Sequence, residues 1–175
     1  MSVDTTFDEM YRFEIGGQLI EITRLGSTIS GEVINFIYEE NKNSSEFDYE
    51  NPIFIKTKIH EDTSLIIYEK LKMLDAIPDM SRIDGWGAGL DGAIYKLEYG
   101  TKKMYSLRSY WSPSAQSDSV KFKNEIILFI EFLRKDLQIE SHSVLLWRHL
   151  ESGTYTIDGF GIYPIIRKRK RKKRR

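Results

Sequence analysis

The sequence predicts an α+β protein, a mainly antiparallel sheet of the β-meander type with two amphipathic helices packed on one face. Four runs of alternating apolar and polar residues lie within the first 60 residues, and short connections join most of them. Two later segments repeat apolar residues at helical spacing. Two further alternating runs stand between those segments, and this order is typical of a sheet whose helices share one side.

The first two strands are expected to form a hairpin. Residues 11–15 and 18–23 each alternate between apolar and polar side chains, and Gly16 and Gly17 separate them. Glycine adopts the positive φ of a tight hairpin turn at little cost, so the glycine pair marks the turn.

Two more predicted strands flank an acidic loop. Residues 32–38 and 53–59 alternate in the same way. The polar segment between them, residues 39–51, carries five acidic side chains and one lysine. We therefore expect a negatively charged connection between the third and fourth strands.

The first helix is expected to begin near residue 62. Asp62, Thr63 or Ser64 can cap it, because their side chains accept hydrogen bonds from first-turn N–H groups. Pro78 stops the helix, since proline lacks the N–H that a helix interior needs. The apolar residues at helical spacing are Leu65, Tyr68, Leu71 and Leu74.

A glycine-rich loop follows, with four glycines in residues 85–92. It lacks the lysine and hydroxyl residue of a phosphate loop and the spacing of the dinucleotide fingerprint. Only Asp84 and Asp91 are well placed for a calcium loop. We interpret the segment as a structural turn, with ligand or partner contact and metal binding as alternatives.

Residues 93–99 and 104–111 form a second predicted hairpin. Ser117, Asp118 or Ser119 can cap the second helix that follows it. The apolar stripe of this helix is Phe122, Ile126, Phe129, Ile130, Leu133 and Leu137.

The last part of the chain is less regular. The periodicity of residues 144–150 fits a strand or a short helix and does not decide between them. Residues 155–157 and 160–166 are expected to form a final strand pair around Asp158 and Gly159.

Composition excludes several classes of protein. The chain has 175 residues and no cysteine, which excludes a disulfide scaffold, a cysteine zinc site and a cysteine nucleophile. No apolar run reaches the 18–20 residues of a membrane span, and the acidic N-terminus is wrong for a signal peptide. We expect a cytoplasmic protein with a single domain over residues 1–166.

The net charge of zero conceals a strong polarity. Residues 1–62 hold 13 acidic and 5 basic side chains, a net charge of −8. Residues 167–175 are all basic, and a run of like charges is expected to be disordered. Three hypotheses stay open for this tail: it binds nucleic acid or another anionic surface, it folds against the acidic body, or it has no role. Its candidate nucleic-acid contacts are Arg167, Lys168, Arg169, Lys170, Arg171, Lys172, Lys173, Arg174 and Arg175.

The sequence offers no catalytic constellation, so we assign no catalytic residue, metal or cofactor. His60, His142 and His149 do not have the spacing of a metal motif. Asp91 and Glu98 flank one predicted strand but lie about 23 Å apart along it, too far for joint acid–base work. An enzyme remains an alternative, with a site of Asp84, Trp86, Asp91, Glu98 and Arg108, in which Arg108 approaches Glu98 across the second hairpin.

One stretch resembles a pattern in small uncharacterised bacterial proteins. The pattern reads LDGxx(W/Y)xLExG, then a turn, an aromatic strand and WSP; here residues 90–100 carry the first part and residues 111–113 the second. Tyr95 stands where tryptophan is expected. The resemblance covers about a quarter of the chain and implies a bacterial cytosolic protein, but it transfers no activity or site residue. In size and acidity such proteins are similar to toxin-neutralising immunity proteins.

The leading hypothesis is a non-catalytic protein-interaction module, most concretely an immunity-type inhibitor of a basic partner. Acidic surfaces steer basic partners and speed their association. Tryptophans beside loops are candidate anchors, although Trp86 and Trp111 also fit residues that close one end of the core. The candidate partner contacts are Glu39, Glu40, Glu46, Asp48, Tyr49, Glu50, Trp86, Asp91, Glu98 and Trp111.

Overall fold

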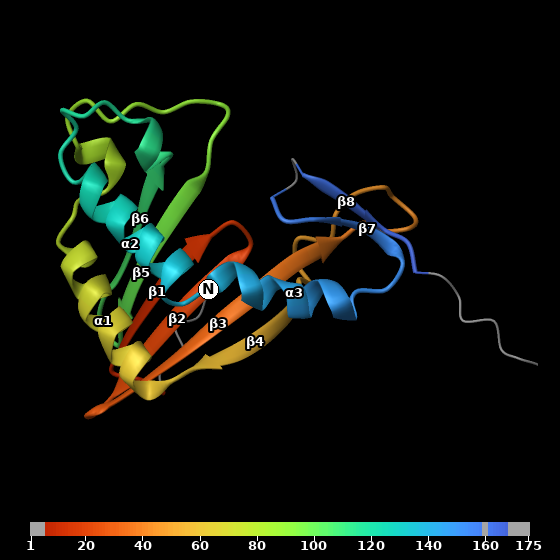
Figure 1. Ribbon diagram of the computed structural model, residues 1–175, viewed down its shortest axis with the longest axis horizontal. Coiled ribbons are helices and arrows are strands. Elements are labelled where there is room, and N and C mark those ends of the chain that lie inside the picture. The colour runs from red at the N-terminus through yellow and green to blue at the C-terminus, as the bar shows by residue number, and fades with distance from the viewer. Residues whose placement is uncertain (1–5, 159–160, 168–175) are drawn as a thin grey trace, which may run out of the picture.

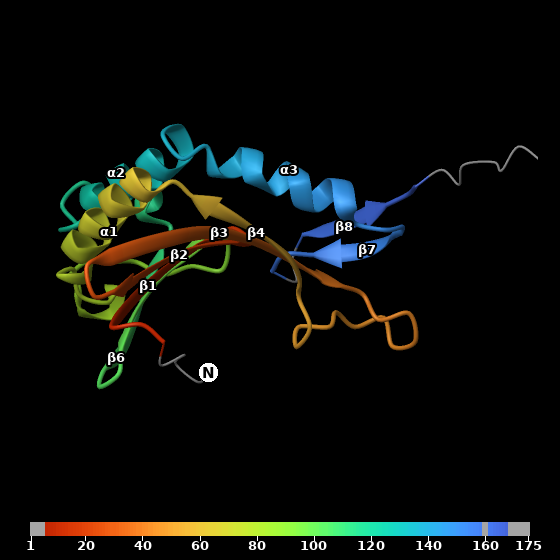
Figure 2. The same ribbon diagram turned by 90° about the horizontal axis from the view of Figure 1, so that it is seen from below.

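The computed structural model describes residues 6–158 and 161–167. Eight strands form one curled sheet in which every strand pairing is antiparallel, and three helices pack on one of its faces (Figure 1, Figure 2). The expected α+β class is confirmed, with one helix more than predicted. The strands are β1 (Glu9–Ile15), β2 (Gln18–Leu25), β3 (Thr28–Glu39), β4 (Ile53–Ile59), β5 (Ile94–Thr101), β6 (Tyr105–Trp111), β7 (Gly153–Thr156) and β8 (Ile162–Ile165). The helices are α1 (Glu61–Asp75), α2 (Lys123–Lys135) and α3 (Ile139–His149), with single 3₁₀ turns η1 (Met80–Arg82) and η2 (Pro113–Ala115).

The sheet is a meander extended at both ends. Its strand order is β6-β5-β1-β2-β3-β7-β8, and β4 pairs with β3 off this path. The long β3 pairs with β2 and β4 over most of its length, and its last two residues, Tyr38 and Glu39, pair with β7. The end of β3 therefore joins the small β7–β8 hairpin to the main sheet.

The predicted turn between β1 and β2 is confirmed. Gly16 and Gly17 have φ values of 51° and 76°, the left-handed conformation that favours glycine. Gly17 is also needed for space, because a Cβ there would lie 2.6 Å from a side-chain carbon of Ile157.

The core lies between the sheet and the helices. Helices α1 and α2 cover the main sheet, while α3 lies over β3 and β4, toward the β7–β8 hairpin (Figure 2). The main core includes Phe13, Ile20, Ile22, Leu97 and Tyr110 from strands, and Ile67, Leu71, Ile126, Phe129 and Leu133 from helices. A smaller cluster under α3 consists of Ile37, Leu146, Leu150 and Tyr155.

The predicted N-caps of both helices are wrong, although α1 begins close to the expected position. Helix α1 begins at Glu61 with His60 as its N-cap, and Ser64 lies inside the helix, where its hydroxyl donates to the His60 carbonyl at 3.0 Å. Helix α2 begins at Lys123, after Phe122 in a left-handed conformation with φ of 66°. Neither helix receives a hydrogen bond from a side-chain cap. The serines and the aspartate that were expected to cap α2 belong to the turn before it.

The ambiguous residues 144–150 lie mainly in α3, which settles the choice in favour of a helix. The final strand pair exists as β7 and β8, and both strands are only four residues long. Gly159 and Phe160, expected near its turn, lie outside the described residues. Among the described helices, none is long and apolar enough to cross a membrane.

Candidate functional site: the acidic hairpin

The connection between β3 and β4, residues 39–51, is called the acidic hairpin below. It is an ordered extension of the two strands. Glu40 and Phe47 form a β-bridge, the Asp48 N–H donates to the Glu39 carbonyl at 2.9 Å, and the Asn41 N–H donates to the Glu46 carbonyl at 2.7 Å. The carboxylates of this segment are therefore displayed on a defined backbone.

None of its five carboxylates forms an ion pair within the described residues, and four of them differ from the fifth in their hydrogen bonds. Glu39, Glu40, Glu46 and Glu50 form no salt bridge with any residue that the structure describes. The fifth, Asp48, accepts hydrogen bonds from the Asn51 side chain at 3.0 Å and from two backbone N–H groups of the turn. The hydrogen bond from the Asn51 side chain, together with those backbone bonds, lowers the pKa of Asp48 below 3.8, so this carboxylate is charged at neutral pH.

An aromatic group adjoins these charges. Tyr49 is 53% exposed, and its ring lies 4.9 Å from the ring of Tyr38 and 6.3 Å from that of Phe47. Three acidic residues and one basic residue line an open hollow of about 460 Å³, so acidic charge predominates there: Glu39, Glu40, Asp48 and Lys42. The hairpin thus combines a negative hollow with an exposed ring that is held in place by its neighbours.

The acidic side chains on the uncovered face of the central strands differ from those of the hairpin, because each has a basic partner. The cross-strand pairs on that face are Arg12–Glu21 at 2.6 Å, Arg12–Glu98 at 3.8 Å, Lys96–Glu14 at 3.1 Å and Lys56–Glu32 at 3.1 Å. Charge is compensated locally on this part of the sheet and uncompensated on the acidic hairpin.

The candidates of the alternative enzyme site are not brought together. Glu98 lies on the uncovered face of β5, and Asp91 is exposed in the loop before that strand. The expected approach of Arg108 to Glu98 is wrong. Arg108 stands opposite Leu97, on the helix-covered face, and bonds to Asp75 instead. Residues on neighbouring strands meet only when they share a face of the sheet.

The two tryptophans near the glycine-rich loop have structural contacts. The Trp86 indole N–H donates to the Trp111 carbonyl at 3.0 Å, and its ring lies 5.8 Å from that of Tyr110. A Cβ on Gly89 or Gly92 would lie 2.6–2.7 Å from the Trp111 ring, so the glycines allow the loop to pack on it. Trp86 packs against the main core, whereas Trp111 stands opposite the half-exposed Ile94 on the uncovered face of the sheet.

His60 and His149 are exposed, and the described residues contain no group of three potential ligands among histidine, aspartate and glutamate.

The tail begins with an anchored residue. The Arg167 guanidinium donates to the carbonyls of Trp147 and Arg148 at 2.8 Å each and to that of Leu150 at 3.0 Å. Its backbone N–H donates to the Ser152 hydroxyl at 2.9 Å. Arg167 therefore caps the C-terminus of α3. The other tail candidates, residues 168–175, lie outside the described residues.

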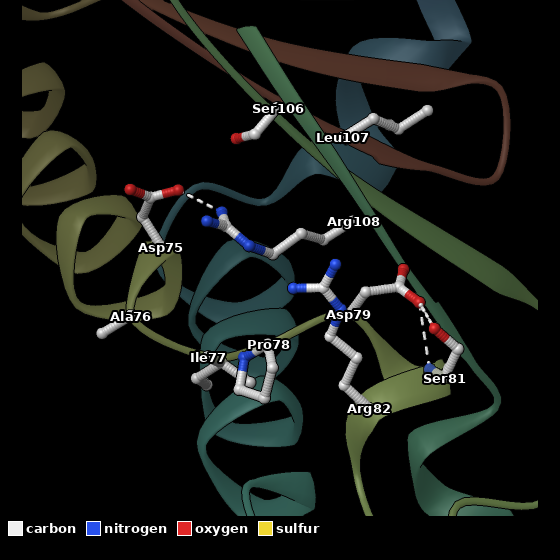
Figure 3. A pocket seen from close by; sticks show the side chains of 10 residues that line it. All are labelled: Asp75, Ala76, Ile77, Pro78, Asp79, Ser81, Arg82, Ser106, Leu107 and Arg108. Atoms are coloured by element: carbon white, nitrogen blue, oxygen red, sulfur yellow. Dashed lines mark hydrogen bonds and ion pairs between the residues drawn. The ribbon is translucent and has the colours of Figure 1, made fainter. Parts of the chain in front are cut away.

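A second hollow, of about 480 Å³, lies at the β6 edge of the sheet (Figure 3). It is lined by the end of α1, η1 and β6, including the side chains of Asp75, Arg82 and Arg108. Sequence reasoning missed it, because no spacing rule connects Arg82 on a 3₁₀ turn with Arg108 on a strand.

No family model, curated protein or solved structure matches this chain. The resemblance carried by residues 90–113 therefore stays an expectation.

Proposed function

We propose that this protein is a non-catalytic protein-interaction module, of the immunity-inhibitor type, that covers a basic partner with its acidic hairpin. One observation carries the proposal. The carboxylates of Glu39, Glu40, Glu46 and Glu50 form no ion pair within the described residues, while acids on the neighbouring sheet face are paired.

Unpaired carboxylates produce the electrostatic field that a basic partner experiences at a distance. Such a field accelerates encounter, and its effect decreases with salt. Paired charges such as Arg12 and Glu21 largely cancel at the same distance. The acidic hairpin is therefore the surface that favours positively charged proteins.

Tyr49 supplies the apolar part of the contact. Its ring rests on Tyr38, so little side-chain entropy is lost when a partner covers it. Backbone hydrogen bonds across the hairpin likewise fix the backbone that carries the carboxylates before binding. A basic partner whose cationic surface is its working surface would be inhibited by this coverage.

The test compares two variants with the same change in charge. The hairpin variant carries Glu39→Gln, Glu40→Gln, Glu46→Gln and Glu50→Gln, and it keeps Asp48 because that carboxylate shapes the turn. The control variant replaces four exposed helix acids by glutamine: Glu61, Glu69, Glu125 and Glu131.

The partner is first captured from nuclease-treated lysate and purified, and association is then followed at low and physiological salt. We expect the hairpin variant to associate at least about tenfold more slowly at low salt, with a weaker salt dependence. The control should stay within about threefold of the native protein. Equal association rates for the two variants would refute the proposal.

A further inference from the structure

The free edge of β6 offers unpaired backbone groups. This strand ends the sheet on one side. The N–H groups of Ser109 and Trp111 point away from β5, because they donate to Asp79 at 2.8 Å and to the Met80 sulfur at 3.1 Å. Backbone groups alternate in direction along an antiparallel strand. The N–H and C=O of Leu107 therefore also point away from β5, as the N–H groups of Ser109 and Trp111 do. In the described part of the chain, β6 pairs only with β5.

The hollow in Figure 3 runs along this unpaired part of the edge. Ser106, Leu107 and Arg108 form one wall, and η1 and the turn after α1 form the other. Figure 3 shows the guanidinium groups of Arg82 and Arg108 in the same hollow, approaching from η1 and from β6. An extended chain lying beside β6 would therefore meet both.

Both guanidinium groups keep donors for a ligand. Arg82 is exposed, and its side chain forms no hydrogen bond or ion pair with the residues that the structure describes, although its backbone N–H donates to the Asp79 carbonyl at 2.8 Å. Arg108 bonds to Asp75 through Nη1, and none of its nitrogens is a buried atom without a partner, so the remaining donors face solvent. Asp79 lines the same hollow and attracts Arg82 electrostatically, but it forms no ion pair with either arginine in the described part of the chain, and its carboxylate accepts hydrogen bonds from Ser81 and Ser109.

We propose that the β6 edge binds an extended acidic peptide segment by strand addition. The segment pairs with the N–H and C=O of Leu107, and main-chain hydrogen bonds of this kind supply affinity in strand addition. Side chains of the added strand alternate between the two faces of the sheet. Those on the helix-covered face meet Arg82 and Arg108, which select a carboxylate through charge-assisted hydrogen bonds.

A second copy of this chain fits the edge less well. Two antiparallel β6 strands related by a two-fold axis at Leu107 would bring the Arg82 and Arg108 groups of both copies toward one shared strand pair. Like charges across such a junction repel. An acidic segment instead compensates the charge, and its own apolar residues can cover Leu107, which is 50% exposed.

The probe is a short fluorescent peptide of alternating threonine and valine with one central glutamate, compared with the same peptide carrying glutamine. Fluorescence anisotropy on the full chain should show at least about tenfold tighter binding of the glutamate peptide. Arg82→Ala should remove most of this preference. Arg148→Ala, an exposed arginine at the far end of the molecule, should leave it within about twofold.

The backbone contact is tested separately. Leu107→Pro removes an N–H that does not face β5, and edge strands tolerate such a change. The variant should bind both peptides about tenfold or more weakly. Leu107→Ala keeps the N–H and loses only the apolar contact of the side chain, so it should weaken binding by no more than about threefold. As a check that needs no variant, the Leu107 amide of the native protein should exchange more slowly when the glutamate peptide is bound.

Several results would overturn the proposal. The first is equal affinity for the two peptides, and the second is an Arg82→Ala variant that still prefers the glutamate peptide as strongly as the native protein does. The third is a Leu107 amide whose exchange is not slowed by the peptide, and the fourth is free glutamate that competes as effectively as the peptide. The fifth is self-association of the chain that Leu107→Pro abolishes. The inference uses a different surface from the acidic hairpin, so either can fail while the other stands.

Discussion

At the scale of single residues, Glu9 links β1 to α1. Its carboxylate accepts hydrogen bonds from Arg24 Nε at 2.9 Å and from the Tyr68 hydroxyl. The Arg24 hydrogen bond is the largest cause of the lowered pKa of Glu9, which lies below 4.5 although burial opposes the shift. A carboxyl group with a depressed pKa stabilises the fold above its unfolded pKa, and that stability is lost as the pH falls through the folded value.

Glu9→Gln is therefore expected to lower the free energy of unfolding by about 1–2 kcal/mol at pH 7, because a charge-assisted hydrogen bond becomes a neutral one. The difference from the native protein should begin to shrink below about pH 4.5, where the unfolded carboxyl becomes protonated, and should be lost as the pH falls through the lowered pKa of the native carboxyl. Urea denaturation at pH 7 and pH 3 measures it. A difference that stays constant between the two values would contradict this assignment.

Lys123 shows what sequence patterns miss at this scale. Helical periodicity placed it outside the apolar stripe of α2, yet the residue is only 7% exposed. Its amine reaches the Gln116 carbonyl at 3.1 Å and the Asp118 carboxylate at 2.5 Å. Both partners lie in the turn that covers the start of α2, and their position follows from tertiary packing rather than from local spacing.

At the scale of elements, the close approach of α1 to β3 depends on Gly31. A Cβ at this position would lie 2.6 Å from the Ser64 hydroxyl and 2.7 Å from the Ile22 Cδ1 atom. Gly31→Ala is therefore expected to cost about 1–3 kcal/mol through overpacking. Adding Ser64→Ala should recover part of the loss, since it removes the nearest atom. A double-mutant cycle in urea measures the coupling, and strictly additive effects would contradict the contact.

The strands were predictable because alternation and the Gly16–Gly17 turn are local signals. The helix caps were not, because capping rules do not distinguish a cap from residues 62–64, which lie inside α1, or from residues 117–119, which lie in the turn before α2. The junction before α3 illustrates this, since Gln138 takes a left-handed conformation with φ of 49°, where glycine is usual.

At the scale of the whole molecule, the distribution of charge along the sequence showed which segment is rich in acidic residues. It did not show which of these residues have a basic ion-pair partner. Glu98 and residues of the acidic hairpin looked equivalent in sequence, and only the register of β1, β2 and β5 shows that Glu98 meets Arg12. The hollow at the β6 edge combines residues 75–82 with residues 106–108, and the sequence carries no signal for this contact.

Arg167 and the remaining basic residues, 168–175, are expected to have different roles, one structural and one in binding, and two variants can distinguish them. Without residues 168–175 the chain holds 18 basic and 26 acidic side chains, a net charge of −8. If those residues bind nucleic acid, the full chain should bind duplex DNA with a log–log salt slope of about −7, near −0.9 for each phosphate contact, and truncation after Arg167 should abolish binding.

Arg167→Ala should behave differently, because this guanidinium donates to three carbonyls at the end of α3. We expect a loss of about 1–2 kcal/mol in the free energy of unfolding and an unchanged salt slope, since Arg167 is not one of the eight phosphate contacts. Urea denaturation and DNA titrations at several salt concentrations measure both quantities on the same variants. Binding by the truncated chain would assign the contact to the body. An Arg167→Ala variant with an unchanged free energy of unfolding would instead assign Arg167 the same binding role as the basic residues that follow it.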